Sequence, residues 1–174
     1  RLRAVPAALD GPGLLYAVVG GTAVPAWVGR VDPGATRATK DVDLLVRRAD
    51  ADRVTAALAP LGFRREDLRG LVLFIDPDEP SRRAGVHLVW SGEHVRPSYI
   101  TPAPAVTEAV RDPEGFLILD LPALVRMKLT SFRDIDRVHI ADLLDVGLID
   151  DRVRSPLPRA VLHRLDEIVR SRSE

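Results

Sequence analysis

The sequence predicts a mixed α/β fold in which a small mixed sheet flanked by helices is followed by a helical C-terminal part. Short apolar runs bounded by Gly, Pro and Asp, which are typical of buried strands, recur through residues 14–90. Helical patterns with capping residues then dominate residues 116–174. The 174 residues suffice for a real core, and with 46% hydrophobic but only 5% aromatic residues this core must consist mainly of Ala, Val and Leu.

Strands and helices are expected to alternate in the N-terminal half. Residues 14–19 form a continuous apolar run that stops at Gly20-Gly21, where a backbone turn tolerates no side chain. Thr22 can then cap a helix over residues 22–28, and a second helix is expected to end near residue 59. The strands expected in this half cover residues 14–19, 41–46, 71–75 and 85–90, which makes a four-stranded sheet.

A proline-rich stretch separates this half from the rest of the chain, because residues 97–113 carry four prolines and little periodicity. We therefore predict an α/β core over residues 1–96, a linker over 97–115 and a helical subdomain over 116–174. Within the subdomain the pattern predicts a short strand at 116–119 and helices over about 121–132, 134–146 and 159–170. The apolar side of the second helix is expected to consist of Ile135, Val138, Leu143 and Val146.

Charge and cysteine content exclude several classes of function. Lys plus Arg and Asp plus Glu both number 25, so no net field draws the chain to nucleic acid or to an anionic membrane, and any polyanion site must be local. The chain has no cysteine, which excludes disulfides, thiolate zinc sites and a cysteine nucleophile. Because no apolar run approaches the roughly 20 residues of a membrane span, we expect a cytoplasmic protein without a membrane partner.

A glycine turn and a pair of carboxylates carry the chemistry of this sequence. Asp41 and Asp43 stand at i and i+2 of an expected strand, so both side chains face one side of the sheet. Such a pair of hard oxygen donors suits the divalent ion that phosphoryl and nucleotidyl transfer require. Gly20-Gly21 and Thr22, at the start of the following helix, would let backbone amides and a hydroxyl approach the phosphates.

Three segments of the chain resemble the DNA polymerase β-type nucleotidyltransferase superfamily, and within it the AbiEii-like toxins of type IV toxin–antitoxin systems. The matching segments are Val19-Gly-Gly-Thr-Ala23, Arg37-Ala-Thr-Lys-Asp-Val-Asp-Leu44, and Lys128 together with Asp142. The resemblance implies the nucleotidyltransferase fold, with transfer of a nucleoside monophosphate from a nucleoside triphosphate to an acceptor hydroxyl. In such toxins the known acceptors are tRNA ends and protein side chains, and the implied partner is an antitoxin.

The same resemblance implies a role for each matching residue. Asp41 and Asp43 would be the catalytic ligands of Mg²⁺ or Mn²⁺, and Lys128 and Asp142 would complete the catalytic site. The triphosphate would be held by Gly20, Gly21, Thr22, Arg37 and Lys128.

His87 stands where the family expects a third carboxylate. Because magnesium prefers oxygen whereas imidazole suits manganese, zinc or iron, three interpretations stay open. His87 could be a variant metal ligand, could leave the metal to the two aspartates and phosphate, or could mark lost catalysis. Asp76 is a further candidate for the missing acid, and His139 replaces another acid in the helical half.

Two other functions compete with the nucleotidyltransferase-like toxin. One is a catalytically degenerate nucleotide-binding or interaction module that has lost the third acid. The other is a small-molecule nucleotidyltransferase resembling aminoglycoside-modifying enzymes, for which the sequence shows no acceptor-pocket signature. Five arginines could form a patch for acceptor RNA or could be an ordinary solvated surface: Arg64, Arg65, Arg69, Arg82 and Arg83.

Overall fold

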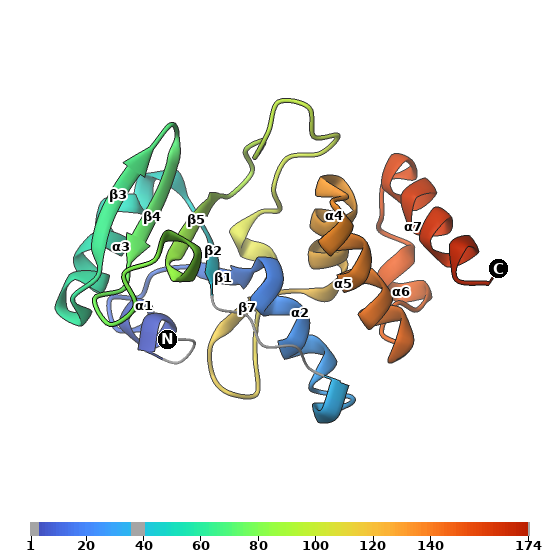
Figure 1. Ribbon diagram of the computed structural model, residues 1–174, viewed down its shortest axis with the longest axis horizontal. Coiled ribbons are helices and arrows are strands. Elements are labelled where there is room, and N and C mark those ends of the chain that lie inside the picture. Colours follow the sequence, from blue (N-terminus) through green and yellow to red (C-terminus); the bar gives the residue numbers. More distant parts are fainter. Residues whose placement is uncertain (1–3, 36–40, 174) are drawn as a thin grey trace.

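A computed structural model describes residues 4–35 and 41–173, and Figure 1 shows a central sheet with helices on both sides. Within these described residues, seven strands form one mixed sheet in the order β3-β4-β5-β2-β1-β7-β6. The strands are β1 (Tyr16–Val19), β2 (Val42–Val46), β3 (Arg64–Leu68), β4 (Leu71–Ile75), β5 (Val86–Trp90), β6 (Ala109–Arg111) and β7 (Leu117–Leu119). The predicted fold class, a mixed sheet flanked by helices, is confirmed.

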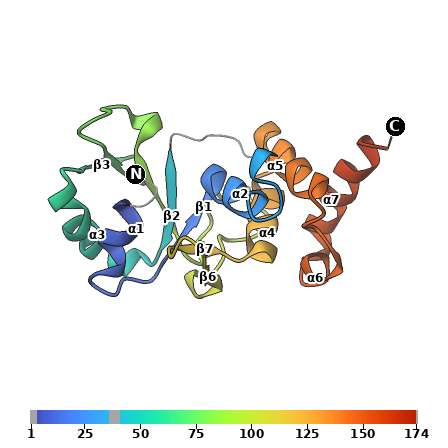
Figure 2. The same cartoon turned by 90° about the horizontal axis from the view of Figure 1, so that it is seen from below.

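The helices gather in two groups on either side of the sheet centre (Figures 1 and 2). Helices α1 and α3 pack on each other beside β3 and β4, whereas α2 packs against β2 and α5, and α4 contacts α5, α6 and α7. The helices are α1 (Ala4–Asp10), α2 (Gly20–Val28), α3 (Ala51–Leu58), α4 (Leu121–Ser131), α5 (Asp134–Asp145), α6 (Asp151–Arg154) and α7 (Arg159–Ser171). Within the described part of the chain, no helix is long and apolar enough to cross a membrane.

The register of the central strands places the polar residues of the candidate site side by side. Strand β2 pairs antiparallel with β1, with Asp43 opposite Val19, and parallel with β5, with Asp43 opposite His87. The apolar residues between them hold this register, because β1 is fully buried and Leu44, Leu45 and Val46 are buried on β2. The polar face of β2 is therefore held against the start of α2 and against β5.

All four predicted N-terminal strands are present, but the sheet is larger than predicted. Strand β3 has the sequence Arg-Arg-Glu-Asp-Leu, which carries no apolar alternation because it is an edge strand with partly exposed side chains. Strand β6 lies inside the stretch predicted as a linker, and it pairs with β7, which in turn pairs with β1. The division into a core, a linker and a helical subdomain stays a prediction.

In α2 and α5 the local sequence pattern predicted the wrong roles for several residues. Helix α2 begins at Gly20 with Val19 as its N-cap, so Thr22 is not the cap. The apolar side predicted for α5 is also partly wrong, because Ile135 and Val138 are 50% and 38% exposed. The side that packs into the protein instead carries Asp136, His139, Ile140 and Leu143. Asp120 caps α4 and accepts a hydrogen bond from the Ala123 backbone amide.

Candidate metal and nucleotide site

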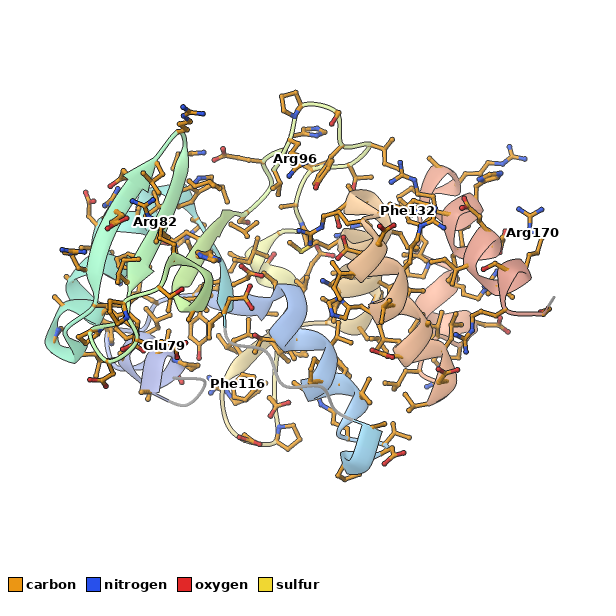
Figure 3. All side chains as sticks on the ribbon, in the orientation of Figure 1. Glu79, Arg82, Arg96, Phe116, Phe132 and Arg170 are labelled. Atoms are coloured by element: carbon orange, nitrogen blue, oxygen red, sulfur yellow. The ribbon has the colours of Figure 1, made fainter. Side chains whose placement is uncertain are left out.

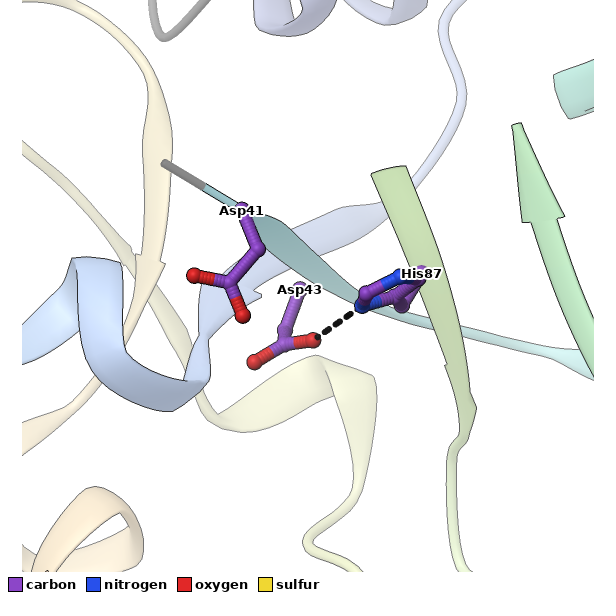
Figure 4. Close-up of side chains that lie close together, drawn as sticks. All are labelled: Asp41, Asp43 and His87. Carbon is purple, nitrogen blue, oxygen red and sulfur yellow. Dashed lines mark ion pairs between the residues drawn. The ribbon is translucent and has the colours of Figure 1, made fainter. Parts of the chain in front are cut away.

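Asp41, Asp43 and His87 form one cluster at the start of β2 and β5 (Figure 4). Each offers one ligand atom, and these three atoms lie within 4.8 Å of one another. His87 Nδ1 is 3.4 Å from Asp43 Oδ1, and both side chains are partly buried. The period of two along β2 and the parallel register of β2 and β5 account for this convergence. The structure therefore brings these three candidate metal ligands together, and their role as ligands stays a prediction.

The backbone before β5 sets the orientation of the His87 ring. Nε2 of His87 lies 2.7 Å from the carbonyl oxygen of Arg82, an acceptor to which only a protonated nitrogen can donate. In the neutral ring this places the proton on Nε2 and leaves the Nδ1 lone pair facing Asp43. The hydrogen bond with Asp43 raises the pKa of His87, against an opposing effect of burial, and the Arg82 carbonyl raises it further.

Position 20 requires glycine, because a side chain there would clash with Asp43. The φ of Gly20 is +67°, in the left-handed region that favours glycine. A Cβ atom at this position would lie 1.9 Å from Asp43 Oδ2 and 2.7 Å from Asp43 Cγ, so any side chain would displace the carboxylate. Thr22, in the first turn of α2, donates from its hydroxyl to the Asp41 carbonyl over 2.6 Å. The helix start thus positions both aspartates.

Lys128 belongs to a buried ionic cluster at the junction of α4 and α5. Its side chain is 3% exposed, and Nζ donates to Oδ1 of Asp136, a carboxylate with no exposed area, over 3.0 Å. Oδ2 of Asp136 accepts from the Ser131 hydroxyl at 2.7 Å and from Arg133 Nε at 2.8 Å. Both oxygens of this carboxylate accept hydrogen bonds, as a buried charge requires.

The charges of this cluster act on one another and on the metal-site cluster. Burial would raise the pKa of Asp136, but the hydrogen bonds and positive charges around it lower the pKa far below its usual value. Burial lowers the pKa of Lys128, and Asp136 only partly offsets this. The negative charge of Asp43 raises the pKa of both Lys128 and Arg133, so the α4–α5 junction lies close enough to the carboxylates for charge interaction.

His139 lies on the same side of α5 as Asp136. Its ring is 6% exposed, and its Nδ1 has no hydrogen-bond partner among the residues that the structure describes. Burial, together with the smaller effect of the Lys128 charge, lowers the pKa of this imidazole to about 4. His139 is therefore a neutral, buried ring near physiological pH.

The remaining predicted residues are placed as follows. Asp142 lies further along α5, partly buried, and its charge acts on His139, whereas the hydrogen-bonding partner of Lys128 is Asp136. Gly21 is part of α2, beside Gly20. Arg37 lies outside the described residues. Asp76 accepts from the Asp78 backbone amide and is not part of the Asp41, Asp43 and His87 cluster.

The predicted arginine patch is largely neutralised within the described structure. Arg64 and Arg82 both pair with Glu66, and Arg65 pairs with Asp67 and Asp52. Arginines that already bind carboxylates are weak binders of a polyanion. The solvated surface is the interpretation that these pairs favour.

Asp136 and Arg133 are site residues that the sequence analysis missed. The available signal was an aspartate three residues after an arginine in the first turn of α5, eight positions beyond Lys128. An acid in the first turn of a helix is common for electrostatic reasons alone, so this signal is weak without the tertiary partner.

The donor set fits a divalent ion. Two carboxylates and one imidazole nitrogen converge, the partly exposed cluster is accessible, and the space in which Asp43 sits exists only because residue 20 lacks a Cβ atom. Carboxylate oxygens suit Mg²⁺ and Mn²⁺, and the added nitrogen favours Mn²⁺ over Mg²⁺. The Arg82 carbonyl supplies the outer hydrogen bond that usually orients a metal-binding histidine.

A scan against protein-family models finds no match, and a search of the curated proteins finds none either. Solved structures do resemble the chain. The solution structure of the antibiotic-resistance factor ANT(2'')-Ia matches with a TM-score of 0.54 and 20% identity, covering 99% of this chain and 90% of that one. The crystal structure of ANT(2'')-Ia in complex with adenylyl-2''-tobramycin matches with a TM-score of 0.56 and 19% identity, covering 99% and 97%. The chain therefore has the nucleotidyltransferase fold.

Proposed function

We propose that this protein is a divalent-metal-dependent nucleotidyltransferase that transfers a nucleoside monophosphate from a nucleoside triphosphate to an acceptor hydroxyl. The observation that carries the proposal is the convergence of Asp41, Asp43 and His87, whose ligand atoms lie within 4.8 Å of one another beside the start of α2. The whole-chain similarity to a fold that holds an adenylylated product in a solved complex supports it.

In this reaction the acceptor hydroxyl loses its proton to solvent or to a site carboxylate and its oxygen bonds to the α-phosphorus. The bond from this phosphorus to the β-phosphate oxygen breaks, and pyrophosphate leaves. Asp41, Asp43 and His87 would hold the ion. When bound, the ion would neutralise triphosphate charge and orient the phosphates. Arg133 and Lys128 would contribute positive charge, and both are held by hydrogen bonds to Asp136. The α2 N-terminus would offer backbone amides to the phosphates.

The acceptor is the finer part of the proposal. The resemblance to AbiEii-like toxins favours tRNA or a protein side chain, together with an antitoxin partner and a cytoplasmic location. The adenylyl-2''-tobramycin bound to ANT(2'')-Ia gives a small-molecule hydroxyl separate support. Incubating the protein with α-labelled nucleoside triphosphates and either total tRNA, a protein extract or tobramycin distinguishes these acceptors.

The proposed function is tested first by binding and then by transfer. Calorimetry should show that a nucleoside triphosphate binds in the presence of Mn²⁺ or Mg²⁺, and that Asp41→Asn combined with Asp43→Asn abolishes this binding. Asp134→Asn, an exposed acid at the start of α5, is the matched control and should bind normally. Binding that is unchanged in the double variant would reject the site.

The second candidate function is a nucleotide-binding module without catalysis, and the histidine at position 87 is the observation that favours it. Replacing His87 with Asp rebuilds three carboxylates, and on the enzyme hypothesis this should shift transfer from Mn²⁺ towards Mg²⁺. If neither the wild type nor His87→Asp transfers label with either ion to any of the three acceptors, while metal-dependent nucleotide binding persists, the binding module replaces the enzyme.

A further inference from the structure

The loop over residues 91–105 follows β5 (Figure 1). Hydrogen bonds anchor it both to the segment after β2 and to the end of α4. Its two arms pair with each other, because the Ala103 amide donates to the Glu93 carbonyl at 2.8 Å and the Gly92 amide donates to the Ala103 carbonyl at 3.2 Å. On the sheet side, the Glu93 carboxylate accepts two hydrogen bonds from Arg48, at 2.9 and 2.6 Å. This stretch is a fixed loop whose outer residues are presented to solvent.

The far side of the loop reaches the helices beside the site. The hydroxyls of Thr101 and Thr130 are 2.6 Å apart, which joins the loop to the last turn of α4. Arg133 follows two residues after α4 ends; the Asp136 carboxylate raises its pKa most, and the negative charge of Asp43 adds to this. Arg133 is thus three residues beyond Thr130, to which the loop is bonded, and within range of the Asp43 charge.

Tyr99 and its surroundings have the chemistry of a nucleotide contact. The ring is partly exposed, and the guanidinium of the exposed Arg96 lies 5.9 Å from its centroid; Figure 3 labels Arg96 on this loop. Arg133 keeps 56% of its side chain exposed while Asp136 holds its Nε. From His94 to Thr107 the chain carries no acidic residue. A partly exposed aromatic ring with a guanidinium group beside it suits a planar base with a phosphate attached.

We propose that Tyr99 stacks on a nucleobase, and that Arg96 and Arg133 flank the phosphate attached to it, at the edge of the site formed by Asp41, Asp43 and His87. The proposal rests on the proposed function, because that function supplies the nucleotide. Its ligand is a nucleotide unit, which has two sources: the donor triphosphate, or a nucleotide at the end of an acceptor RNA. Because hydrogen bonds anchor the loop, the backbone that carries Tyr99 is ordered before the ligand binds, which lowers the entropic cost of binding.

The test compares full-length wild type, Tyr99→Ala and Tyr99→Phe, with Val95→Ala as a control on the same loop that is also exposed. Calorimetry with Mn²⁺ measures binding of ATP, of inorganic tripolyphosphate, and of a single-stranded RNA hexamer. Tyr99→Ala should weaken ATP or RNA binding by roughly five- to a hundred-fold, since loss of one aromatic stack has about this effect. Tyr99→Phe should bind nearly as the wild type does, and tripolyphosphate binding should not change.

A loss confined to ATP identifies the donor base, and a loss confined to RNA identifies an acceptor nucleotide. The proposal is overturned if Tyr99→Ala matches Val95→Ala for both ligands, or if the wild type binds neither. Tyr99→Leu, which keeps apolar bulk without an aromatic face, replaces the alanine variant if circular dichroism shows that the latter is unfolded. Failure of the proposed function has a different signature: ATP binding that does not depend on Asp41 and Asp43, whatever Tyr99 does.

Discussion

Two glycines with the same backbone conformation allow the role of Gly20 to be measured. Gly20 and Gly13 both have a φ of +67°, but a Cβ atom at residue 13 would meet nothing within 4 Å, whereas at residue 20 it would lie 1.9 Å from Asp43 Oδ2. Alanine at either position pays the penalty of the left-handed region, roughly 1–2 kcal/mol. Only Gly20→Ala also forces the Asp43 carboxylate out of its position.

The free energy of unfolding and the affinity for metal should therefore respond differently. We expect both variants to lose a similar free energy of unfolding, roughly 1–2 kcal/mol, because the carboxylate of Asp43 is partly exposed and can rotate away. Binding of Mn²⁺ should fall at least about ten- to a hundred-fold in Gly20→Ala alone, since even disturbing the support of a ligand has this effect. Urea denaturation measures the first quantity and calorimetric titration with Mn²⁺ the second.

The outcome that would refute this reasoning is equal Mn²⁺ affinity in Gly20→Ala and Gly13→Ala. The Asp43 carboxylate would then not be a metal ligand in the position that the structure gives it. A loss of folding in Gly20→Ala, with Gly13→Ala intact, would instead show that Asp43 cannot rotate, and the role of Asp43 would then be measured by the Mn²⁺ affinity of Asp43→Asn.

Two further predictions concern the buried charges of α4 and α5. Asp136→Asn should lose about 3–5 kcal/mol of unfolding free energy, because it leaves the 3% exposed Lys128 without a carboxylate; adding Lys128→Met should recover part of this in a double-mutant cycle, and additive losses would contradict the pair. His139 has a folded-state pKa of about 4, below the unfolded value of 6.5, so the unfolded chain binds more protons between these values and stability falls by up to about 3 kcal/mol as the pH drops from 6.5 to 4. His139→Leu should flatten urea-measured stability over that window, and an unchanged pH dependence would refute the assignment.

The carboxylates of the site were predictable because local rules govern them. Asp41 and Asp43 share a face through the period of two along a strand, and the break after Val19 needs glycine for conformational reasons. Both rules act over a few residues, so the sequence suffices. Thr22 shows the limit of such reasoning: its hydroxyl was expected to cap a helix, but α2 starts two residues earlier and the hydroxyl bonds to Asp41, nineteen positions away.

The helical side of the site was not predictable in the same way. Amphipathic periodicity assigns Ile135 and Val138 to the buried side of α5, because it considers only where apolar residues recur. It cannot predict that a charged residue is buried by pairing, and in the structure Ile135 and Val138 are exposed. Asp136 is buried because Lys128, Ser131 and Arg133 together supply its hydrogen bonds, and three of these four residues lie in a different helix or in the turn between the helices. Only the packing of α4 on α5 makes that burial favourable.

The register of β2 and β5 makes position 87 the neighbour of Asp43 whatever residue stands there. An acid at this position would place three negative charges within a few ångströms of one another. Their mutual repulsion would destabilise the folded state unless a bound ion neutralised it. A histidine whose Nε2 is held by the Arg82 carbonyl can donate a proton from Nδ1 to Asp43 when the ring is charged, and can offer the Nδ1 lone pair to an ion when the ring is neutral. The cluster in this chain is therefore compatible with the fold when no ion is bound, and its two oxygens and one nitrogen favour a later divalent ion than three carboxylates would.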